Sequence, residues 1–232
     1  MGISRTMRNE GKHSSFNQRW KWHRRAPLRW LWNLLLHFAY VALMHLEVRG
    51  IENVPARGPV IVMINHVNFF DSIVVLAALG RPITPLAKVE AFEDWRLRPL
   101  VTTYGAIPVH RGAVDTAAIR SATEVLRDGG MLLISPEGTR SPTGALMQGQ
   151  EGMAYLATRT NALVLPVGIV GTPRLWPMLK RLHRAHITFT VGASFQLQTT
   201  QKPTREELRH LTDRAMHALA RTLPEEMRGI YG

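Results

Sequence analysis

The chain of 232 residues contains no cysteine. Without thiols it can form neither a disulfide framework nor a zinc–thiolate site, and a cysteine nucleophile is excluded, although the redox compartment stays undetermined. The sequence also has no internal repeat and no low-complexity stretch beyond a basic N-terminus. From residue 48 onward it lacks zinc-ligand spacing, a recognition-helix pattern and an aromatic RNA-binding motif. These absences count against a nucleic-acid-binding protein.

Acidic residues are scarce: 17 Asp and Glu stand against 29 Lys and Arg, a formal net charge of +12. This balance indicates an anionic partner, which could be nucleic acid, a membrane surface or a phosphorylated substrate. Residues 1–29 hold eight Lys or Arg and the single acid Glu10. Four tryptophans lie in or beside this region: Trp20, Trp22, Trp30 and Trp32. Because tryptophan and arginine together are typical of a membrane interface, we favour an anionic bilayer and expect no nucleic acid.

Long hydrophobic runs are missing as well. The apolar stretch 31–46 is interrupted by Asn33, His37 and His45, and it is shorter than the roughly 20 residues that a bilayer span needs. Several of its apolar side chains recur at helical spacing: Leu31, Leu34, Leu35, Phe38 and Ala42. A helix with such a face can lie in the membrane interface.

These patterns divide the N-terminal region in two. We predict a basic flexible tail over residues 1–15 and a helical anchor over residues 16–46 that lies in, or dips into, one leaflet. A helix buried against the domain and a full transmembrane span remain alternatives. Residues 1–6 fit the loose N-myristoylation pattern, which such an anchor makes unnecessary. A cleaved signal peptide fits poorly, because no small-residue cleavage site follows the apolar stretch.

Residues 47–232 alternate between strand-like and helix-like segments. Strands are expected at 60–64, 83–87, 131–134, 164–169 and 186–191, and helices at 73–79, 91–101 (interrupted by Pro99), 115–127, 151–160 and 204–223. Asp115 is a candidate helix cap, and Thr204 with Glu207 forms a candidate capping box. This alternation predicts an α/β fold, with a mainly parallel or mixed sheet covered by helices and preceded by the N-terminal membrane-associated helical segment.

The chemistry is concentrated where strands end. Asn65, His66 and Asp71 follow the apolar run 60–64, and Asp71 opens the next apolar segment as a helix cap would. Histidine can take a proton near neutral pH, and a carboxylate can fix its tautomer. Five residues apart on one helix, the two side chains would diverge by about 140°. They can pair only if His66 lies on the turn and Asp71 at the helix start; the alternative is an ordinary surface loop.

Three further segments follow the same rule. Residues 135–140 (Ser-Pro-Glu-Gly-Thr-Arg) follow the apolar run 131–134, and residues 105–111 place Arg111 after a short strand. The strand 164–169 carries Pro166 near its middle. Taken in chain order, the four segments resemble the motif set of the glycerolipid acyltransferases, and in particular of the bacterial 1-acylglycerol-3-phosphate O-acyltransferases (lysophosphatidate acyltransferases).

That family is marked by Asn-His-x4-Asp, a Gly-x5-Arg block, Pro-Glu-Gly-Thr-Arg and a Val-Pro-Val type strand, and the resemblance spans about residues 48–195. Two positions depart from it. Ser135 stands where an aromatic residue often precedes Pro-Glu-Gly-Thr-Arg, and His110 stands before Arg111 where the family is variable. Neither departure removes a residue that the chemistry needs.

The resemblance implies direct transfer of a fatty acyl group from a thioester to the free hydroxyl of 1-acyl-glycerol 3-phosphate, giving phosphatidic acid. His66 would remove the hydroxyl proton and Asp71 would orient the ring. The acceptor phosphate needs fixed cations, for which an arginine fork is well shaped. The candidate substrate-binding residues are Arg140, Arg111, Lys88, Glu137, Gly138, Thr139 and Asn65. For Arg111 and Lys88 a solvated charge is the alternative, and Asn65 could instead shape the turn.

No cofactor or metal is expected, and the acyl donor would be acyl-CoA or acyl carrier protein. The protein would work on the membrane, at the cytoplasmic face of a bacterial inner membrane. Two alternatives stay open. One is an acyltransferase of the same fold that uses another acceptor, such as glycerol 3-phosphate, an ornithine lipid or another lysolipid. The other is a basic module that binds membranes or nucleic acid and catalyses nothing.

Overall fold

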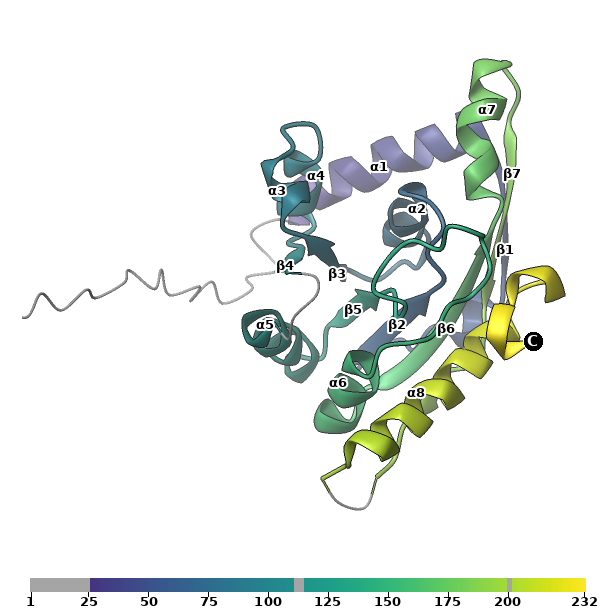
Figure 1. Cartoon of the computed structure of the whole chain (residues 1–232). Coiled ribbons are helices and arrows are strands. Elements are labelled where there is room, and N and C mark those ends of the chain that lie inside the picture. The colour runs from purple at the N-terminus through teal and green to yellow at the C-terminus, as the bar shows by residue number, and fades with distance from the viewer. Residues whose placement is uncertain (1–25, 111–114, 200–201) are drawn as a thin grey trace, which may run out of the picture.

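A computed structural model describes residues 26–110, 115–199 and 202–232 (Figure 1). Its strands are β1 (Met44–Arg49), β2 (Val60–Ile64), β3 (Ile83–Lys88), β4 (Ile107–Val109), β5 (Met131–Ile134), β6 (Leu163–Val170), β7 (Ala185–Val191) and β8 (Phe195–Gln196). Its α-helices are α1 (Ala26–Leu43), α2 (Phe70–Ala78), α3 (Glu90–Glu93), α4 (Arg98–Thr103), α5 (Thr116–Arg127), α6 (Gly152–Thr160), α7 (Leu175–Lys180) and α8 (Arg205–Ala220). Short 3-10 turns are η2 (Ile51–Asn53), η3 (Thr172–Arg174), η4 (Glu225–Met227) and η5 (Gly229–Tyr231).

The strands form one mixed sheet in the order β1-β7-β6-β2-β5-β3-β4, with β8 paired to β6. Most neighbours are parallel, and the antiparallel pairs both involve β6, with β7 and with β8. Every residue of β2 and β5 is buried, because both faces of these central strands are covered. This explains why they read as continuous apolar runs rather than as alternating ones. The prediction of an α/β fold with a mainly parallel or mixed sheet is confirmed.

Helices cover both faces of the sheet and create two cores (Figure 1). One core lies under α5, α6 and α8, and the other contains side chains of α2 together with Trp32 and Leu36 of α1 and Met178 and Leu179 of α7. The β7 strand shows the buried and exposed alternation expected for residues 186–191. The sheet therefore separates the two cores, and the loops at the carboxyl ends of its parallel strands carry the candidate site.

Two helix starts follow the predicted capping chemistry. The Asp115 carboxylate accepts a hydrogen bond from the backbone N–H of Ala118 at 2.9 Å, and the Thr204 hydroxyl accepts one from the backbone N–H of Glu207 at 3.1 Å. The second half of the predicted box differs, because the Glu207 carboxylate accepts from the hydroxyl of Thr199 at 2.8 Å. Glu207 thus ties the start of α8 to the preceding loop.

Three local predictions are wrong. Residues 91–101 form two short helices, α3 and α4, and Pro99 lies in the first turn of α4, where its missing N–H breaks no helical bond. Residues 44–46 are not helical but begin β1, which pairs with β7. Asp71 is not the helix cap, since α2 already begins at Phe70. The predicted tail 1–15 and residues 16–25 of the predicted anchor lie outside the described residues.

The part of the anchor that the structure describes is α1, an 18-residue helix. Its inner side chains Trp32 and Leu36 pack on the core, while Leu31, Leu35 and Phe38 face outward and are exposed. Among the described residues, no helix combines the length and the apolar content that crossing a bilayer would require.

Candidate functional site

The His66 and Asp71 side chains meet beyond the carboxyl end of β2. His66 lies on the turn that follows the strand, and Asp71 lies in the first turn of α2. This arrangement brings Nδ1 of His66 to 3.2 Å from Oδ2 of Asp71. The backbone N–H of Asp71 donates to the carbonyl of Asn68, which closes the turn at 3.2 Å. The condition that the sequence set for a His–Asp pair is therefore met.

Asp71 is fully buried, and every contact of its carboxylate fixes its orientation. Oδ2 accepts from the backbone N–H groups of Val67 at 2.7 Å and Asn68 at 2.6 Å, and Oδ1 accepts from the hydroxyl of Thr172. Because a carboxylate oxygen only accepts, the facing Nδ1 of His66 carries the ring proton and Nε2 keeps its lone pair. The His66 side chain is 15% exposed, so the ring is held from one side and reachable from the other.

Asn65 lies beneath this turn. Its Nδ2 donates to the carbonyl of Ile169 at 2.9 Å, and its Oδ1 accepts from the backbone N–H of Ile169 at 2.8 Å. The side chain is buried and locks the end of β2 to β6. The oxygen and one N–H of the Asn65 amide therefore both bond the backbone of Ile169. The turn-shaping alternative describes its position.

Glu137 braces the histidine turn from the neighbouring loop. Its Oε1 accepts from the backbone N–H of His66 at 3.2 Å and its Oε2 from that of Met147 at 3.0 Å. The backbone N–H of Ser141 also donates to the carbonyl of His66 at 2.7 Å. Burial raises the pKa of the Glu137 carboxyl above its ordinary value, and the two N–H donors partly offset this. Glu137 forms no ion pair with Arg140 or with any other described residue, and both of its carboxylate oxygens accept backbone N–H groups.

Gly138, Thr139 and Arg140 are exposed at the tip of the same loop. Gly138 has φ of 71°, a left-handed conformation that suits glycine, and its N–H donates to the carbonyl of Ser135 at 3.1 Å. Arg140 makes no ion pair with any described residue. Its neighbour Ser141 is bonded to His66, so this free guanidinium belongs to a segment tied directly to the histidine turn.

The two remaining candidate cations are Lys88, which lies farther along the sheet from His66, and Arg111. Lys88 is the exposed last residue of β3, which β5 separates from β2. Arg111 lies outside the described residues. The preceding His110 pairs with Asp115, whose carboxylate accepts from the His110 backbone N–H at 3.0 Å. Together with the N–H of Ala118, this bond lowers the pKa of Asp115 to about 2.

Thr172 is a site residue that the sequence interpretation missed. It is buried in η3, directly after β6, and its hydroxyl donates to Asp71 across 101 positions of sequence. The signal that could have found it was its place just past a strand end, the position that had already marked His66 and Glu137. No motif spacing links Thr172 to Asp71, because the contact depends on β6 lying beside β2.

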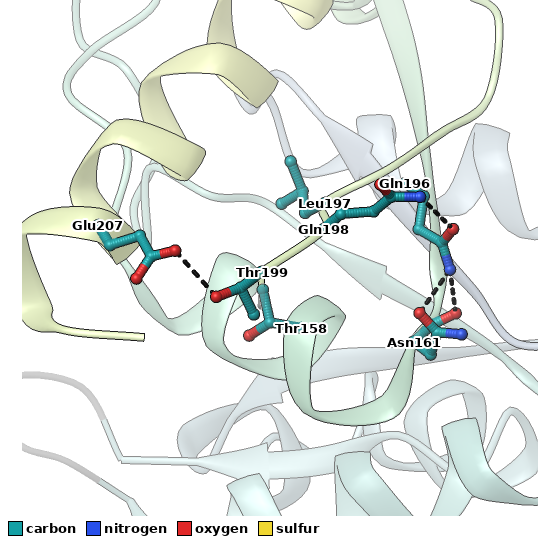
Figure 2. Close-up of a pocket in the computed structure, with 7 residues that line it drawn as sticks. All are labelled: Thr158, Asn161, Gln196, Leu197, Gln198, Thr199 and Glu207. Carbon is teal, nitrogen blue, oxygen red and sulfur yellow. Dashed lines mark hydrogen bonds between the residues drawn. The ribbon is translucent and has the colours of Figure 1, made fainter. Parts of the chain in front are cut away.

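A separate hollow of about 510 Å³ lies between α6, β8 and the start of α8 (Figure 2). Its polar side chains already bond one another, Thr199 with Glu207 and Gln196 with Asn161. The β8 strand pairs with Leu163 and Val164 at the beginning of β6, whereas Asn65 bonds Ile169 near its end. This hollow therefore lies at the opposite edge of the sheet from His66. Within the described ranges, no three His, Asp or Glu side chains gather as metal ligands.

Comparison with known proteins gives matches over the same region. A family model described as Acyltransferase matches residues 45–170. A protein of Borreliella burgdorferi named 1-acyl-sn-glycerol-3-phosphate acyltransferase is 30% identical over 57% of this chain and 54% of its own length. A chloroplastic protein of the same enzyme name from Arabidopsis thaliana is 28% identical over 57% of this chain and 38% of its own length. The chain thus spans about half, or less, of the length of these relatives.

A solved structure shares the fold. The crystal structure of the 1-acyl-sn-glycerophosphate (LPA) acyltransferase PlsC from Thermotoga maritima superimposes with a TM-score of 0.66. The two sequences are 24% identical, and the match covers 87% of this chain and 81% of that one.

Proposed function

The chain belongs to the Acyltransferase family, whose model spans more than half of it, and we propose that it acylates lysophosphatidate to phosphatidic acid. The acyl group would come from a thioester and go to the free hydroxyl of 1-acyl-glycerol 3-phosphate. The observation that carries the proposal is the His66–Asp71 pair, with Nδ1 facing a buried carboxylate and Nε2 left to act as a base. The names of the two relatives support the same reaction.

The proposed chemistry uses Nε2 of His66 as a general base. Nε2 takes the proton of the acceptor hydroxyl while the oxygen attacks the thioester carbonyl, and the new C–O bond forms as the C–S bond breaks. The proton then passes from His66 to the departing thiolate. Asp71 stabilises the imidazolium that exists between these steps. Positioned general-base catalysis of this kind contributes about 10²- to 10⁴-fold to the rate.

Phosphate recognition is assigned to the loop around Arg140. Its guanidinium is exposed and unpaired among the described residues, and a planar fork suits phosphate oxygens. Thr139 would add a backbone or hydroxyl donor at the same tip, whereas the Gly138 N–H already donates to the carbonyl of Ser135. Lys88 and Arg111 remain secondary candidates for the same phosphate or for the charged part of the donor.

The proposed setting is the surface of an anionic bilayer, at the cytoplasmic face of a bacterial inner membrane. The outward Leu31, Leu35 and Phe38 of α1 support this, since exposed apolar side chains on one helix face are typical of an interfacial helix. Acyl-CoA and acyl carrier protein are both acidic donors, and a chain with a net charge of +12 would attract either.

A purified-protein assay tests the reaction and the acceptor together. The full chain is incubated with acyl-CoA or acyl carrier protein as donor, and with lysophosphatidate, glycerol 3-phosphate, a lyso-ornithine lipid or lysophosphatidylcholine as acceptor. The proposal predicts phosphatidic acid, detected by mass spectrometry, as the main product, and its loss in His66→Ala. Preference for another acceptor would replace the substrate but keep the chemistry, whereas no transfer to any acceptor from either donor would overturn the proposal.

A further inference from the structure

The connection between β6 and β7 presents an unusual surface. Residues 172–184, here called the α7 hairpin, contain η3, α7 and the turn that leads into β7. Leu175 of α7 is buried, and Met178 and Leu179 pack on the core beneath. Trp176 is 59% exposed and Leu182 at the tip is 97% exposed. The hairpin is thus apolar on its inner face and also at two positions that contact no core.

The same hairpin is strongly basic. Its cations are Arg174, Lys180, Arg181 and Arg184, all exposed and none in an ion pair with a described residue. Lys180 lies over the ring of Trp176, with Nζ 5.9 Å from the ring centroid. No acidic residue occurs anywhere between Glu151 and Glu206. Exposed tryptophan and leucine among unneutralised cations form a surface complementary to anionic lipid.

The backbone of Leu182 adds an independent observation. Leu182 has φ of +56°, the left-handed conformation, and it follows the end of α7 where the N–H groups of Leu182 and His183 donate to Leu179 and Met178. Glycine or asparagine favours such a position, and a leucine there is disfavoured by about 1–2 kcal/mol. The Leu182 side chain gains almost no burial in the folded chain. Burial of the Leu182 side chain against a binding partner would offset the cost of its left-handed backbone and explain why a leucine occupies this position.

The hairpin lies beside α1, the helix that we propose lies at the bilayer surface. The strands β1 and β7 are parallel, and Met44 pairs with Ala185, so the carboxyl end of α1 at Leu43 adjoins the end of the hairpin at Arg184. Both α1 and α7 cover the same face of the sheet as α2 (Figure 1). The exposed apolar side chains of α1 and those of the hairpin therefore lie on one side of the molecule.

The hairpin is also joined to the candidate site. Thr172 in η3 donates its hydroxyl to Asp71, and only two residues separate it from the first residue of α7. Trp176 and Leu182 therefore follow Thr172, the residue that bonds the carboxylate facing His66, by four and ten positions along the chain.

We propose that the α7 hairpin is a second membrane contact, distinct from residues 1–46, in which Trp176 and Leu182 enter the interface of an anionic bilayer. Arg174, Lys180, Arg181 and Arg184 then meet the lipid headgroups. The inference rests on the proposed bilayer partner and is independent of acyl transfer. A second copy of this chain could cover the apolar tip, and nucleic acid could meet the cations, but neither accounts for both features together.

The absence of cysteine allows a direct test, because a single introduced thiol labels one site only. Leu182→Cys in the full chain is labelled with an environment-sensitive fluorophore and mixed with vesicles of phosphatidylglycerol and phosphatidylcholine. The proposal predicts a blue shift and quenching by lipid-attached quenchers. The matched control is Ile230→Cys, an exposed apolar position in η5 beside α8, whose label should stay in water.

Leu182→Gly complements the label, because glycine suits φ of +56° and the fold should be kept or stabilised. Its partition onto the same vesicles should fall by roughly 10-fold, the order expected when one leucine side chain no longer leaves water. Lys180→Gln with Arg181→Gln should weaken binding to anionic vesicles by roughly 5-fold per charge removed and leave zwitterionic vesicles unaffected.

Three outcomes would overturn the proposal. The label at position 182 could stay in water while the protein is bound to vesicles, which would leave residues 1–46 as the whole contact. It could respond to protein concentration without vesicles, which would indicate a second copy, or to duplex DNA but not to lipid. A protein that inserts position 182 yet transfers no acyl group would retain this inference and lose the proposed function.

Discussion

His66 and His110 each precede an aspartate by five residues, and in both pairs Nδ1 of the ring faces Oδ2 of the carboxylate, at 3.2 Å and 2.9 Å. The surroundings of the pairs differ. The His110 side chain is 75% exposed and Asp115 also caps α5, whereas the His66 side chain is 15% exposed and Asp71 is fully buried. A five-residue spacing between a histidine and an aspartate is therefore not enough to identify a general base. Burial of the carboxylate at a strand end sets the first pair apart.

Thr172→Val should test how far Asp71 depends on its second anchor. Valine keeps the shape but removes the hydroxyl, which leaves Oδ1 of a buried carboxylate without its donor. The free energy of unfolding should fall by about 1–3 kcal/mol. Because Thr172 acts through Asp71, kcat should fall while KM stays unchanged.

Denaturant unfolding and steady-state kinetics measure the two effects, and Thr172→Ser, which keeps the hydroxyl, should restore both. A valine variant with wild-type kcat would mean that Thr172 only supports the fold.

At the scale of elements, the sequence predicts best where burial is uniform. The strands β2 and β5 could be predicted because all their residues are buried and apolar. The helix α5 could be predicted because Asp115 marks its start. The division of residues 91–101 into α3 and α4 could not be predicted, since local propensity does not show that Pro99 lies in the first turn of a second helix. The contacts of Asn65, Glu137 and Thr172 join segments far apart in sequence and follow from sheet order, which no local pattern encodes.

The start of α5 carries a pH-dependent prediction. Asp115→Ala removes a helix cap and should lower the free energy of unfolding by about 0.5–2 kcal/mol at pH 7. The folded-state pKa of Asp115, about 2, lies below its ordinary value of 3.8, so the carboxylate stabilises the fold above that value. This contribution should disappear as the pH falls through 3.8 toward 2.

Denaturant titrations of the two proteins from pH 7 to pH 2.5 measure this difference. A constant gap between wild type and Asp115→Ala across that range would contradict the assigned pKa.

The loop at residues 135–141 carries the prediction on phosphate recognition. Arg140 is exposed and unpaired among the described residues, while its neighbours fasten the loop to His66. A charge-assisted hydrogen bond contributes about 1.5–3 kcal/mol, so Arg140→Ala should weaken kcat/KM for a phosphorylated acceptor by about 10- to 150-fold.

Activity on a phosphate-free analogue should barely change, and Arg209→Ala, which removes an exposed arginine of α8, should affect neither acceptor. An equal loss on both acceptors in Arg140→Ala would mean that Arg140 supports the loop and does not bind phosphate.

At the scale of the whole molecule, attraction to a bilayer has an apolar and an ionic part. The apolar part comes from exposed side chains such as Trp30, Leu35 and Phe38, and the ionic part from a net charge of +12. Salt screens the ionic part and leaves the apolar part. High salt should therefore release the protein only partly from anionic vesicles, whereas detergent should release it fully.

Flotation of the full chain with vesicles, with and without 1 M salt, measures this release. Nucleic-acid binding would instead weaken steeply with salt because it depends on counterion release. Complete release by salt, together with tight binding to duplex DNA at physiological ionic strength, would reverse the choice of partner. The full chain is needed, because deleting residues 1–46 would remove Trp32 and Leu36 from the core and three residues from β1.

The most direct measurement is the turnover of His66→Ala on lysophosphatidate at matched protein concentration. His210→Ala, which removes an exposed histidine of α8, serves as the control. Because His66→Ala removes the general base, its turnover should fall by about 10²- to 10⁴-fold, while folding and vesicle binding are retained. Asp71→Asn should fall less, because a reoriented amide can still accept from Val67 and Asn68 and donate to Thr172. Near-normal turnover in His66→Ala would contradict the account.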